Sequence, residues 1–339
     1  MASPIDIKTK TSNLKPVKNE FNKTLVLESL EKNIITHWDN WGRFQQIWNN
    51  QAYASFKDFD KYLVLIYLIR DNFQQYADKF NYYSYDEFYA LEHVIINKLN
   101  LIKIATELNI PKETIRRKVN ELQRDEILSR EGKKIILTRK AVNYQKPQAS
   151  LEALSSFLEK KSNILQGEEW FGDSIKKNEI ISYIEKYFTI IWLRFLKLQI
   201  PFLLRHRANF GDLETWMIWG NIALHHQKIL NNHMNNSVES EIIDHHNYYK
   251  KISTLKIERG VNTSSIADIT SIPRATVIRK LKWLVQKGTI KKNENLEYFL
   301  TNKGNLNKRI EENFRINQIY VAEFLSDFFD YYKDSKFSP

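Results

Sequence analysis

The stretch Ile110-Pro-Lys-Glu-Thr-Ile-Arg-Arg-Lys-Val119 returns later in the chain as Ile272-Pro-Arg-Ala-Thr-Val-Ile-Arg-Lys-Leu281, 162 residues further on (272 − 110). The match runs without a gap from Asn100 and Asn262 to Leu128 and Ile290. A fainter match, Trp41-Gly-Arg-Phe44 with Trp192-Leu-Arg-Phe195, has an offset of 151 (192 − 41). It predicts that the second half has gained about eleven residues (162 − 151), around 225–246. Repetition at this scale predicts that one structural module, long helices included, occurs twice.

Each copy has the pattern of a helix-turn-helix, in which two short helices are joined by a tight turn. Pro111 and Pro273 are expected at the first position of the second helix, where a missing N–H group costs nothing. Ala105 and Ala267 are small enough for the two helices to cross closely. The apolar residues of the second helix recur at the spacing of a buried helix face. They are Ile115, Val119 and Leu122 in the first copy, and Val277, Leu281 and Leu284 in the second.

The other side chains of these second helices are predicted to face outward and to suit DNA. Hydroxyl and guanidinium groups near the N-terminus of a helix fit the base edges of the major groove. The hairpins that follow are expected to carry cations at their tips, where backbone phosphates would lie. The predicted DNA-binding residues are Lys112, Glu113, Thr114, Arg116, Arg117, Asn120, Arg130, Lys133 and Lys134 in the first copy, and Arg274, Thr276, Ile278, Arg279, Lys282, Lys291 and Lys292 in the second.

Positive charge is concentrated in these two copies. The net charge of the whole chain is +11. Residues 101–140 hold 11 Lys or Arg against 6 Asp or Glu, and residues 263–303 hold 8 against 3, so each window carries +5 (11 − 6 and 8 − 3). Because the two windows supply nearly all of the excess charge, they indicate a polyanionic partner, double-stranded DNA.

The second copy resembles winged helix-turn-helix bacterial regulators of the MarR and IclR kinds. The residues that carry the resemblance are Ile266-Ala-Asp-Ile-Thr-Ser-Ile-Pro-Arg-Ala-Thr-Val-Ile-Arg-Lys-Leu281, then Gly288-Thr-Ile290 and Leu300-Thr-Asn-Lys-Gly304. The first copy is similar but has Glu126 in place of the glycine. The long flanking helices resemble the dimerisation helices of the MarR group in their placement. The resemblance implies that Thr114, Thr276, Arg117 and Arg279 contact phosphates or bases.

Hydrophobic periodicity predicts a mainly α fold with small β-wings. Helices are expected over 22–50, 58–79 and 85–98, then a helix-turn-helix at 100–125 and a wing at 127–138. Further helices are expected over 149–165, 174–207 and 212–232, then a second module at 245–301 and a final helix at 304–333. The predicted domains are a disordered segment (1–20), two helical plus winged-helix modules (21–148 and 174–303), a linker between them (149–173) and a C-terminal helix that packs on the hub (304–339).

Composition narrows the setting in which the protein works. The chain has no cysteine, which excludes a disulfide scaffold and a cysteine-ligated zinc finger. The polar start of the chain lacks the apolar core of a signal peptide. The most apolar stretch, from Tyr187 to Leu204, contains Arg194 and Lys197, which favours a buried helix over a membrane span. We therefore expect a soluble, cytoplasmic protein without membrane contact.

Two residue clusters outside the helix-turn-helix copies have alternative interpretations. Several histidines lie near Asp244, but their spacing matches no metal-binding motif, so a solvated linker is favoured and no metal is expected. Aromatic residues at helical spacing favour plain core, with a pocket for a small-molecule effector as the alternative. The histidines are His225, His226, His233, His245 and His246, and the aromatic residues are Trp192, Phe195, Phe202, Phe210, Trp216 and Trp219.

No catalytic constellation or phosphate-binding loop is recognisable in the sequence, so neither an enzyme nor a cofactor is expected. The leading interpretation is a transcriptional regulator in which one chain supplies both readers of a two-part DNA site, as a monomeric pseudo-dimer. The long helices would form its hub. The alternatives are a replication initiator of the plasmid or phage type, which also joins two winged helices, and a docking protein whose winged helices bind protein.

Overall fold

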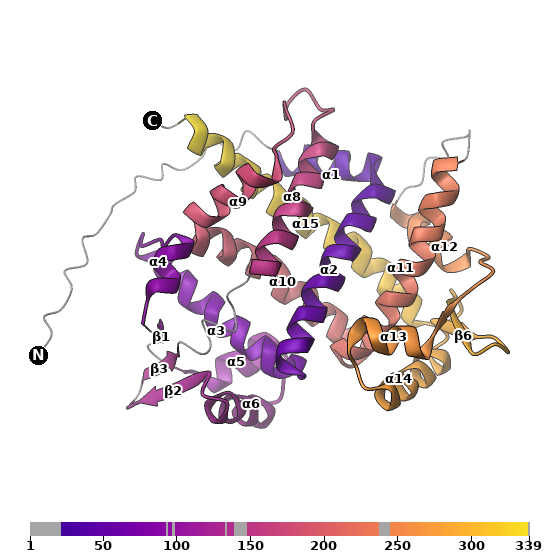
Figure 1. The fold of residues 1–339 in the computed structure, drawn as a ribbon, viewed down its shortest axis with the longest axis horizontal. Helices are drawn as coiled ribbons and strands as arrows, with labels where there is room; N and C mark the ends of the chain where they lie inside the picture. Colours follow the sequence, from indigo (N-terminus) through magenta and orange to yellow (C-terminus); the bar gives the residue numbers. More distant parts are fainter. Residues whose placement is uncertain are drawn as a thin grey trace, which may run out of the picture.

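The computed structural model describes residues 22–92, 94–96, 99–132, 134–138, 148–236 and 245–337. Helices make up 73% of the structure and the strands form two small antiparallel sheets, which confirms the prediction of a mainly α fold. The long helices lie together in the middle of the molecule, and the sheets lie at its lower left and lower right (Figure 1). The segment predicted to be disordered, 1–20, falls outside the described residues.

Both halves of the chain contain the same order of elements. The first half consists of α1 (Lys23–Lys32), α2 (Ile34–Phe56), α3 (Phe59–Asp78), α4 (Tyr85–Ala90), β1 (Val94–Ile96), α5 (Leu101–Leu108), α6 (Lys112–Arg124), β2 (Leu128–Glu131), β3 (Lys134–Leu137) and α8 (Gln148–Leu165). The second half consists of α9 (Lys177–Lys186), α10 (Phe188–Phe210), α11 (Leu213–Asn236), α12 (His245–Thr254), β4 (Val261–Asn262), α13 (Thr263–Thr270), α14 (Arg274–Gln286), β5 (Ile290–Lys292), β6 (Glu297–Leu300) and α15 (Leu306–Phe337). The strand orders correspond as well, β1-β3-β2 and β4-β6-β5.

The register between the upstream helices of the two halves differs from the predicted one. Helices α1 and α9 have 10 residues each and α2 and α10 have 23 each, all at an offset of 154 (177 − 23 and 188 − 34). The break between the paired helices has the same backbone conformation at Asn33 (φ −114°, ψ 35°) and Tyr187 (φ −115°, ψ 36°). The predicted offset of 151 was therefore wrong by about one helical turn, because helical periodicity creates accidental matches between aromatic-rich helices. The second half has gained eight residues (162 − 154) before its helix-turn-helix segment, not about eleven.

Three of the predicted helices are shorter than expected. The segment 85–98 ends its helix at Ala90, and Val94–Ile96 forms strand β1 instead, because three β-branched residues pair there with β3. The segments 22–50 and 174–207 are each broken into two helices, at Asn33 and Tyr187. Helices α9 and α10 meet at an angle of 104°.

The hub of the molecule has paired helix contacts that follow the same correspondence. Helix α2 packs against α11 and α8, while its counterpart α10 packs against α3 and α15. Likewise α1 packs on α15, and α9 packs on α8. Between α2 and α10, Gln45 donates to Gln199 at 2.8 Å and Gln199 donates back at 2.9 Å. Gln45 and Gln199 are themselves 154 residues apart (199 − 45), so they occupy equivalent positions in the two halves. Their reciprocal hydrogen bonds therefore mark a local two-fold axis.

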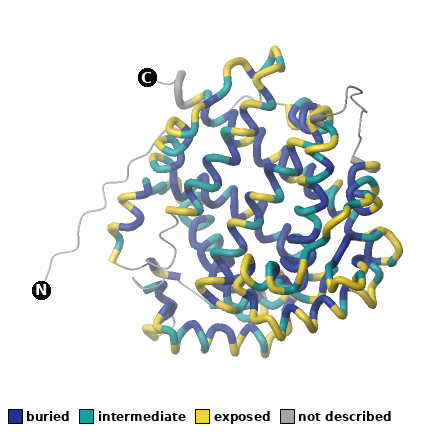
Figure 2. Tube along the Cα trace, turned by 45° about the vertical axis from the view of Figure 1, so that its right-hand side comes forward, coloured by how far each residue is buried: buried dark blue, intermediate teal, exposed yellow. Residues whose placement is uncertain are grey.

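The interior is continuous from the hub helices into both sheets. The buried residues follow the inner faces of the long helices, and exposed residues lie on the outside (Figure 2). The segment 149–173, predicted as a linker, contains α8, whose residues Leu151, Leu154 and Phe157 are buried against the hub. Among the described residues no single helix is both long and apolar enough to cross a membrane, and only α9 and α10 taken together, across their bend, meet those two criteria.

Candidate nucleic-acid interface

The predicted helix-turn-helix segments form two matching helix pairs, α5 with α6 and α13 with α14. The turn after the first helix of each pair has a left-handed residue, Asn109 (φ 49°) and Ser271 (φ 56°), which ends that helix tightly. Pro111 and Pro273 lie one position before the second helix rather than at its first residue. The predicted apolar face of the second helix is buried in both copies, from Ile115 to Leu122 and from Val277 to Leu284.

The outward faces of α6 and α14, which we call the basic helices, carry the predicted polar and cationic side chains. Both basic helices lie along the lower edge of the molecule (Figure 1). The side chain of Arg117 is 65% exposed, and Arg279 is exposed as well. Thr114 and Thr276 are half-buried at the start of the two helices. The other exposed predicted residues are Lys112, Glu113, Arg116 and Asn120 on α6, and Arg274, Ile278 and Lys282 on α14.

The two helices of each pair begin differently. An asparagine side chain caps the first helix, with Asn100 Oδ1 accepting from the Lys103 N–H at 3.0 Å and Asn262 Oδ1 accepting from the Ser265 N–H at 2.9 Å. Among the described residues no side chain caps α6 or α14. The first N–H groups of a helix carry a partial positive charge and suit an anion such as phosphate. The uncapped starts of both basic helices are therefore chemically ready for phosphate contacts.

A buried lysine fixes each basic helix to the hub. Lys118 is 7% exposed and its Nζ lies 2.5 Å from Asp58 and 2.9 Å from Glu121. Its equivalent Lys280 (118 + 162) is 4% exposed and its Nζ lies 2.6 Å from Asp212. Asp58 and Asp212 also cap the starts of α3 and α11 through backbone N–H groups. Each carboxylate thus joins the start of a hub helix to the middle of a basic helix.

The electrostatics of these carboxylates follow from the lysines. Burial alone raises the pKa of the Asp58 carboxyl, but hydrogen bonds from Lys118 and the Lys61 N–H, with the Lys118 charge, lower it overall. The pKa of Asp212 is lowered in the same way by Lys280 and Thr215 against the opposing effect of burial. Both carboxylates therefore stay ionised beside their lysines. Sequence reasoning missed these lysines, although Lys118 lies on the buried stripe, three residues after Ile115 and four before Leu122.

The two basic helices differ in how many of their exposed cations form ion pairs. On α6, Arg116 lies 2.6 Å from Glu113, and Arg117 lies 3.8 Å from Glu121. On α14, none of the cations on the outward face has an ion-pair partner among the described residues; they are Arg274, Arg279 and Lys282. The second basic helix therefore offers more uncompensated positive charge than the first.

The hairpins after the basic helices match the predicted cation positions only in part. In the first, Arg130 and Lys134 are exposed near the turn, while Lys133 lies outside the described residues. In the second, Lys291 and Lys292 are exposed but belong to strand β5, and the turn itself is formed by residues 293–296. Lys292 ends its strand directly before this turn, which is longer than the turn of the first hairpin.

One histidine of the inserted stretch, His226, has a structural role. His226 is fully buried and its Nε2 accepts from the Leu300 N–H at 3.1 Å. Its Nδ1 lies 3.1 Å from the Ile252 carbonyl oxygen, so the ring bridges α11, α12 and β6. Burial lowers the pKa of His226 to about 4, which keeps the ring neutral. No group of three or more metal-ligating side chains occurs among the described residues.

The chain was compared with known protein families, curated proteins and solved structures. No protein-family model, curated protein or solved structure matches the chain.

Proposed function

We propose that the two halves are winged helix-turn-helix modules and that the chain is a sequence-specific, double-stranded DNA-binding transcriptional regulator. One polypeptide would supply both readers of a two-part site, with the paired helices as hub. The main observation that supports this proposal is that α6 and α14 present exposed cationic faces, with uncapped N-termini, along one edge of the molecule. Such helices suit neighbouring major grooves, and basic residues of the hairpins suit the phosphates beside them.

The two modules are proposed to read unequal half-sites. At equivalent positions, the first has Glu113 and Arg116 where the second has Ala275 and Ile278. A carboxylate accepts from cytosine and a guanidinium donates to guanine, whereas apolar side chains contact the thymine methyl group. The preferred site is therefore an imperfect palindrome. Recovery of a perfect palindrome by selection from random DNA would contradict this.

Removal of one arginine from each basic helix tests the proposal. Binding of labelled genomic fragments to the full chain is measured by fluorescence anisotropy at several salt concentrations. Arg117→Ala and Arg279→Ala are each expected to cost about 1–3 kcal/mol of binding free energy. The second should cost more, because Arg279 has no ion-pair partner in the described structure and Arg117 has Glu121.

A lysine on another side of the molecule provides the matched control. Lys176 is exposed and directly precedes α9, which lies away from the edge that carries α6 and α14 (Figure 1). Lys176→Ala removes the same charge and should leave DNA affinity and its salt dependence unchanged. If Arg117→Ala with Arg279→Ala also leaves them unchanged, the basic helices do not bind DNA. Absence of DNA binding by the unaltered chain would point to a docking protein, and binding to iterated direct repeats would point to a replication initiator.

A further inference from the structure

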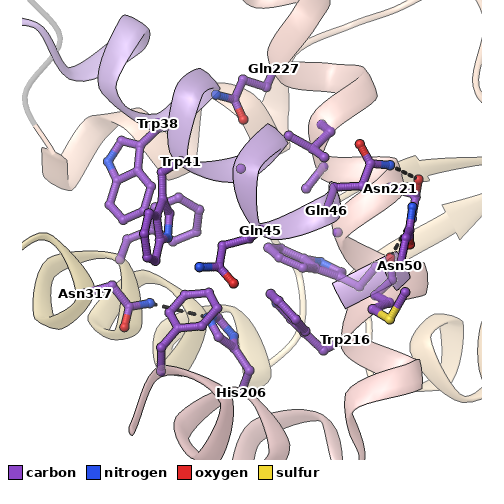
Figure 3. Close-up of a pocket in the computed structure, with 18 residues that line it drawn as sticks. Trp38, Trp41, Gln45, Gln46, Asn50, His206, Trp216, Asn221, Gln227 and Asn317 are labelled. Atoms are coloured by element: carbon purple, nitrogen blue, oxygen red, sulfur yellow. Dashed lines mark hydrogen bonds between the residues drawn. The ribbon is translucent and has the colours of Figure 1, made fainter. Parts of the chain in front are cut away.

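A cavity of about 90 Å³ lies in the hub between α2, α10, α11 and α15 (Figure 3). Its wall is mainly aromatic and amide side chains, and Gln45 of the reciprocal glutamine pair lies among them. Two glycines, Gly42 on α2 and Gly220 on α11, lie in its lining, and Leu224 of α11 packs directly on Gly42, where a Cβ atom would lie 2.6 Å from the leucine Cδ2. A Cβ atom placed on Gly220 would meet nothing within 4 Å, so this position faces open space.

Several residues that line the cavity have larger apolar counterparts in the equivalent helix crossing of the other half. Position by position, at the offset of 154, small or polar residues of the α2–α11 crossing correspond to large apolar residues of the α10–α3 crossing. The three replacements are buried, at 1–2% exposure, and fill their crossing. They are Leu196 for Gly42, Ile200 for Gln46 and Ile66 for Gly220. At these positions the two halves therefore pack with side chains of different size.

Several residues of the lining carry hydrogen-bond donors without partners in the described part of the chain. The indole Nε1–H groups of Trp38, Trp41 and Trp219 meet no acceptor among the described residues, although each ring is at least 95% buried. Buried donors are satisfied in native proteins with few exceptions, so unpaired ones indicate a missing acceptor. One lining acceptor, Asn50 Oδ1, is also without a partner there.

His206 adds a further donor to the lining. Asn317 Oδ1 accepts from Arg205, at 3.1 Å from Nε and 2.6 Å from the terminal nitrogen, so the Asn317 amide nitrogen faces His206 Nε2 at 3.3 Å and donates to it. Burial, with the Arg205 charge, lowers the pKa of His206 to about 3, so the ring is neutral and its proton lies on Nδ1. That Nδ1–H has no acceptor among the described residues.

We propose that the hub cavity is a binding site for a small, uncharged ring compound that carries hydrogen-bond acceptors. No lining residue is ionised, which disfavours a charged ligand. An apolar cavity of about 150 Å³ accommodates benzene, so this smaller one limits the ligand to a single ring. Acceptor atoms of the ligand would satisfy the tryptophan and histidine donors that the protein leaves unpaired.

The cavity is connected to the second basic helix. Asn50 lines it and donates through Nδ2 to the Ile269 carbonyl oxygen of α13 at 3.0 Å. Helix α11, which forms one wall, holds Lys280 of α14 through Asp212 and Thr215. A ligand that alters the α2–α11 crossing would therefore shift the second module relative to the first. This regulatory step rests on the proposed function, whereas ligand binding does not.

Three ring compounds of similar size serve as probes: pyrimidine, which has acceptors, benzene, which has neither acceptor nor donor, and pyrrole, which has a donor. Binding to the full chain is measured by calorimetry and by the rise in Tm. Pyrimidine is expected to bind with at least tenfold lower Kd than benzene or pyrrole. Equal affinity for the three probes, or no binding of pyrimidine, would overturn the proposal.

Variants locate the site. Gly220→Ile reproduces the Ile66 packing of the other half and is expected to weaken pyrimidine at least tenfold. Trp219→Phe removes one donor and keeps the ring, so it should weaken pyrimidine but not benzene, and it serves where Gly220→Ile fails to fold. Unchanged pyrimidine affinity in a folded Gly220→Ile or Trp219→Phe variant would refute the assignment.

The regulatory step is measured separately, as the DNA affinity of the unaltered chain with and without pyrimidine. A change of several-fold that Gly220→Ile abolishes supports the coupling. Pyrimidine binding without any change in DNA affinity rejects the coupling and leaves the ligand site in place. A chain that binds pyrimidine but no DNA rejects the proposed function and leaves the site in place as well.

Discussion

The buried histidines predict a steep loss of stability in mildly acidic solution. His206 and His226 have folded pKa values of about 3 and about 4, against 6.5 for an unperturbed ring. The unfolded chain therefore binds protons that the folded chain rejects, and stability is full above pH 6.5 and declines as the pH falls towards the folded values. Between about pH 7.5 and about pH 5, each ring contributes a loss of about 2 kcal/mol.

Two other buried groups act in the same direction. Burial lowers the pKa of His37, and of Lys161, well below their ordinary values, so protonation of either group also favours the unfolded chain. They add to the loss of about 4 kcal/mol from His206 and His226. Burial raises the pKa of Asp327, so this carboxyl acts in the opposite direction as the pH falls. Carboxyls with lowered pKa values contribute little in this window, because their unfolded pKa values are near 4.

Urea unfolding followed by circular dichroism measures this loss at the two pH values. His226→Gln is expected to be less stable at both, but its drop between them should be about 2 kcal/mol smaller than that of the unaltered chain. His233→Gln, at an exposed position of α11, is the matched control and should leave the drop unchanged. Equal stability of the unaltered chain at both pH values, or an equal drop in His226→Gln, would refute the assignment of a neutral, clamped His226.

Three further predictions concern the packing of the two halves, and all are measured by urea unfolding. Lys280→Met leaves Asp212 and Glu214 without their buried cation and should lower the free energy of unfolding by about 1–3 kcal/mol. This is less than for a fully buried ion pair, because the two carboxylates are partly solvated. An unchanged free energy of unfolding would show that these ion pairs do not hold α14. Position 126 has a left-handed backbone (φ 59°), like Gly288 (φ 68°), so Glu126→Gly should stabilise the fold by up to about 1 kcal/mol. Gly288→Ala should destabilise the fold for the same reason. The opposite signs would contradict the argument from backbone strain. Gln45→Leu alone should lower the free energy of unfolding by about 1–3 kcal/mol, because it leaves the buried Gln199 amide unpaired. Adding Gln199→Leu should recover part of this loss, since the double variant has no unpaired amide. Strictly additive effects of the two substitutions would count against the reciprocal pair.

The helix pairs α5–α6 and α13–α14 could be predicted closely from the sequence because their signals are local. The predicted span of 100–125 contains α5 and α6, and 127–138 contains β2 and β3. Apolar residues at a spacing of three and four and a proline at the start of the second helix act within a few residues of one another. The same signals predicted the exposed side of α6 and α14.

Features that depend on contacts across the fold were beyond such local signals. Strand β1 forms because Val94–Ile96 pairs with β3, and a helical pattern over 85–98 cannot reveal that partner. The hub register was missed because matches one helical turn apart look alike in aromatic-rich helices. The cavity was predicted only in part, as the alternative interpretation of the aromatic residues: Trp216, Trp219 and Phe202 line it, whereas Trp192, Phe195 and Phe210 do not.

Because both halves belong to one chain, equivalent positions can carry different residues. The glutamine at the axis is the same in both halves, whereas residues around it differ. In a homodimer every change occurs twice, so a glycine that opens one crossing opens the other too. In this chain Gly220 opens the α2–α11 crossing while Ile66 closes the α10–α3 crossing. At the local axis Gln45 meets its own equivalent Gln199, and changing one amide alone would leave the other unpaired in the interior. Off the axis no such coupling applies, so one half is free to keep a cavity and the two basic helices are free to differ in what they contact.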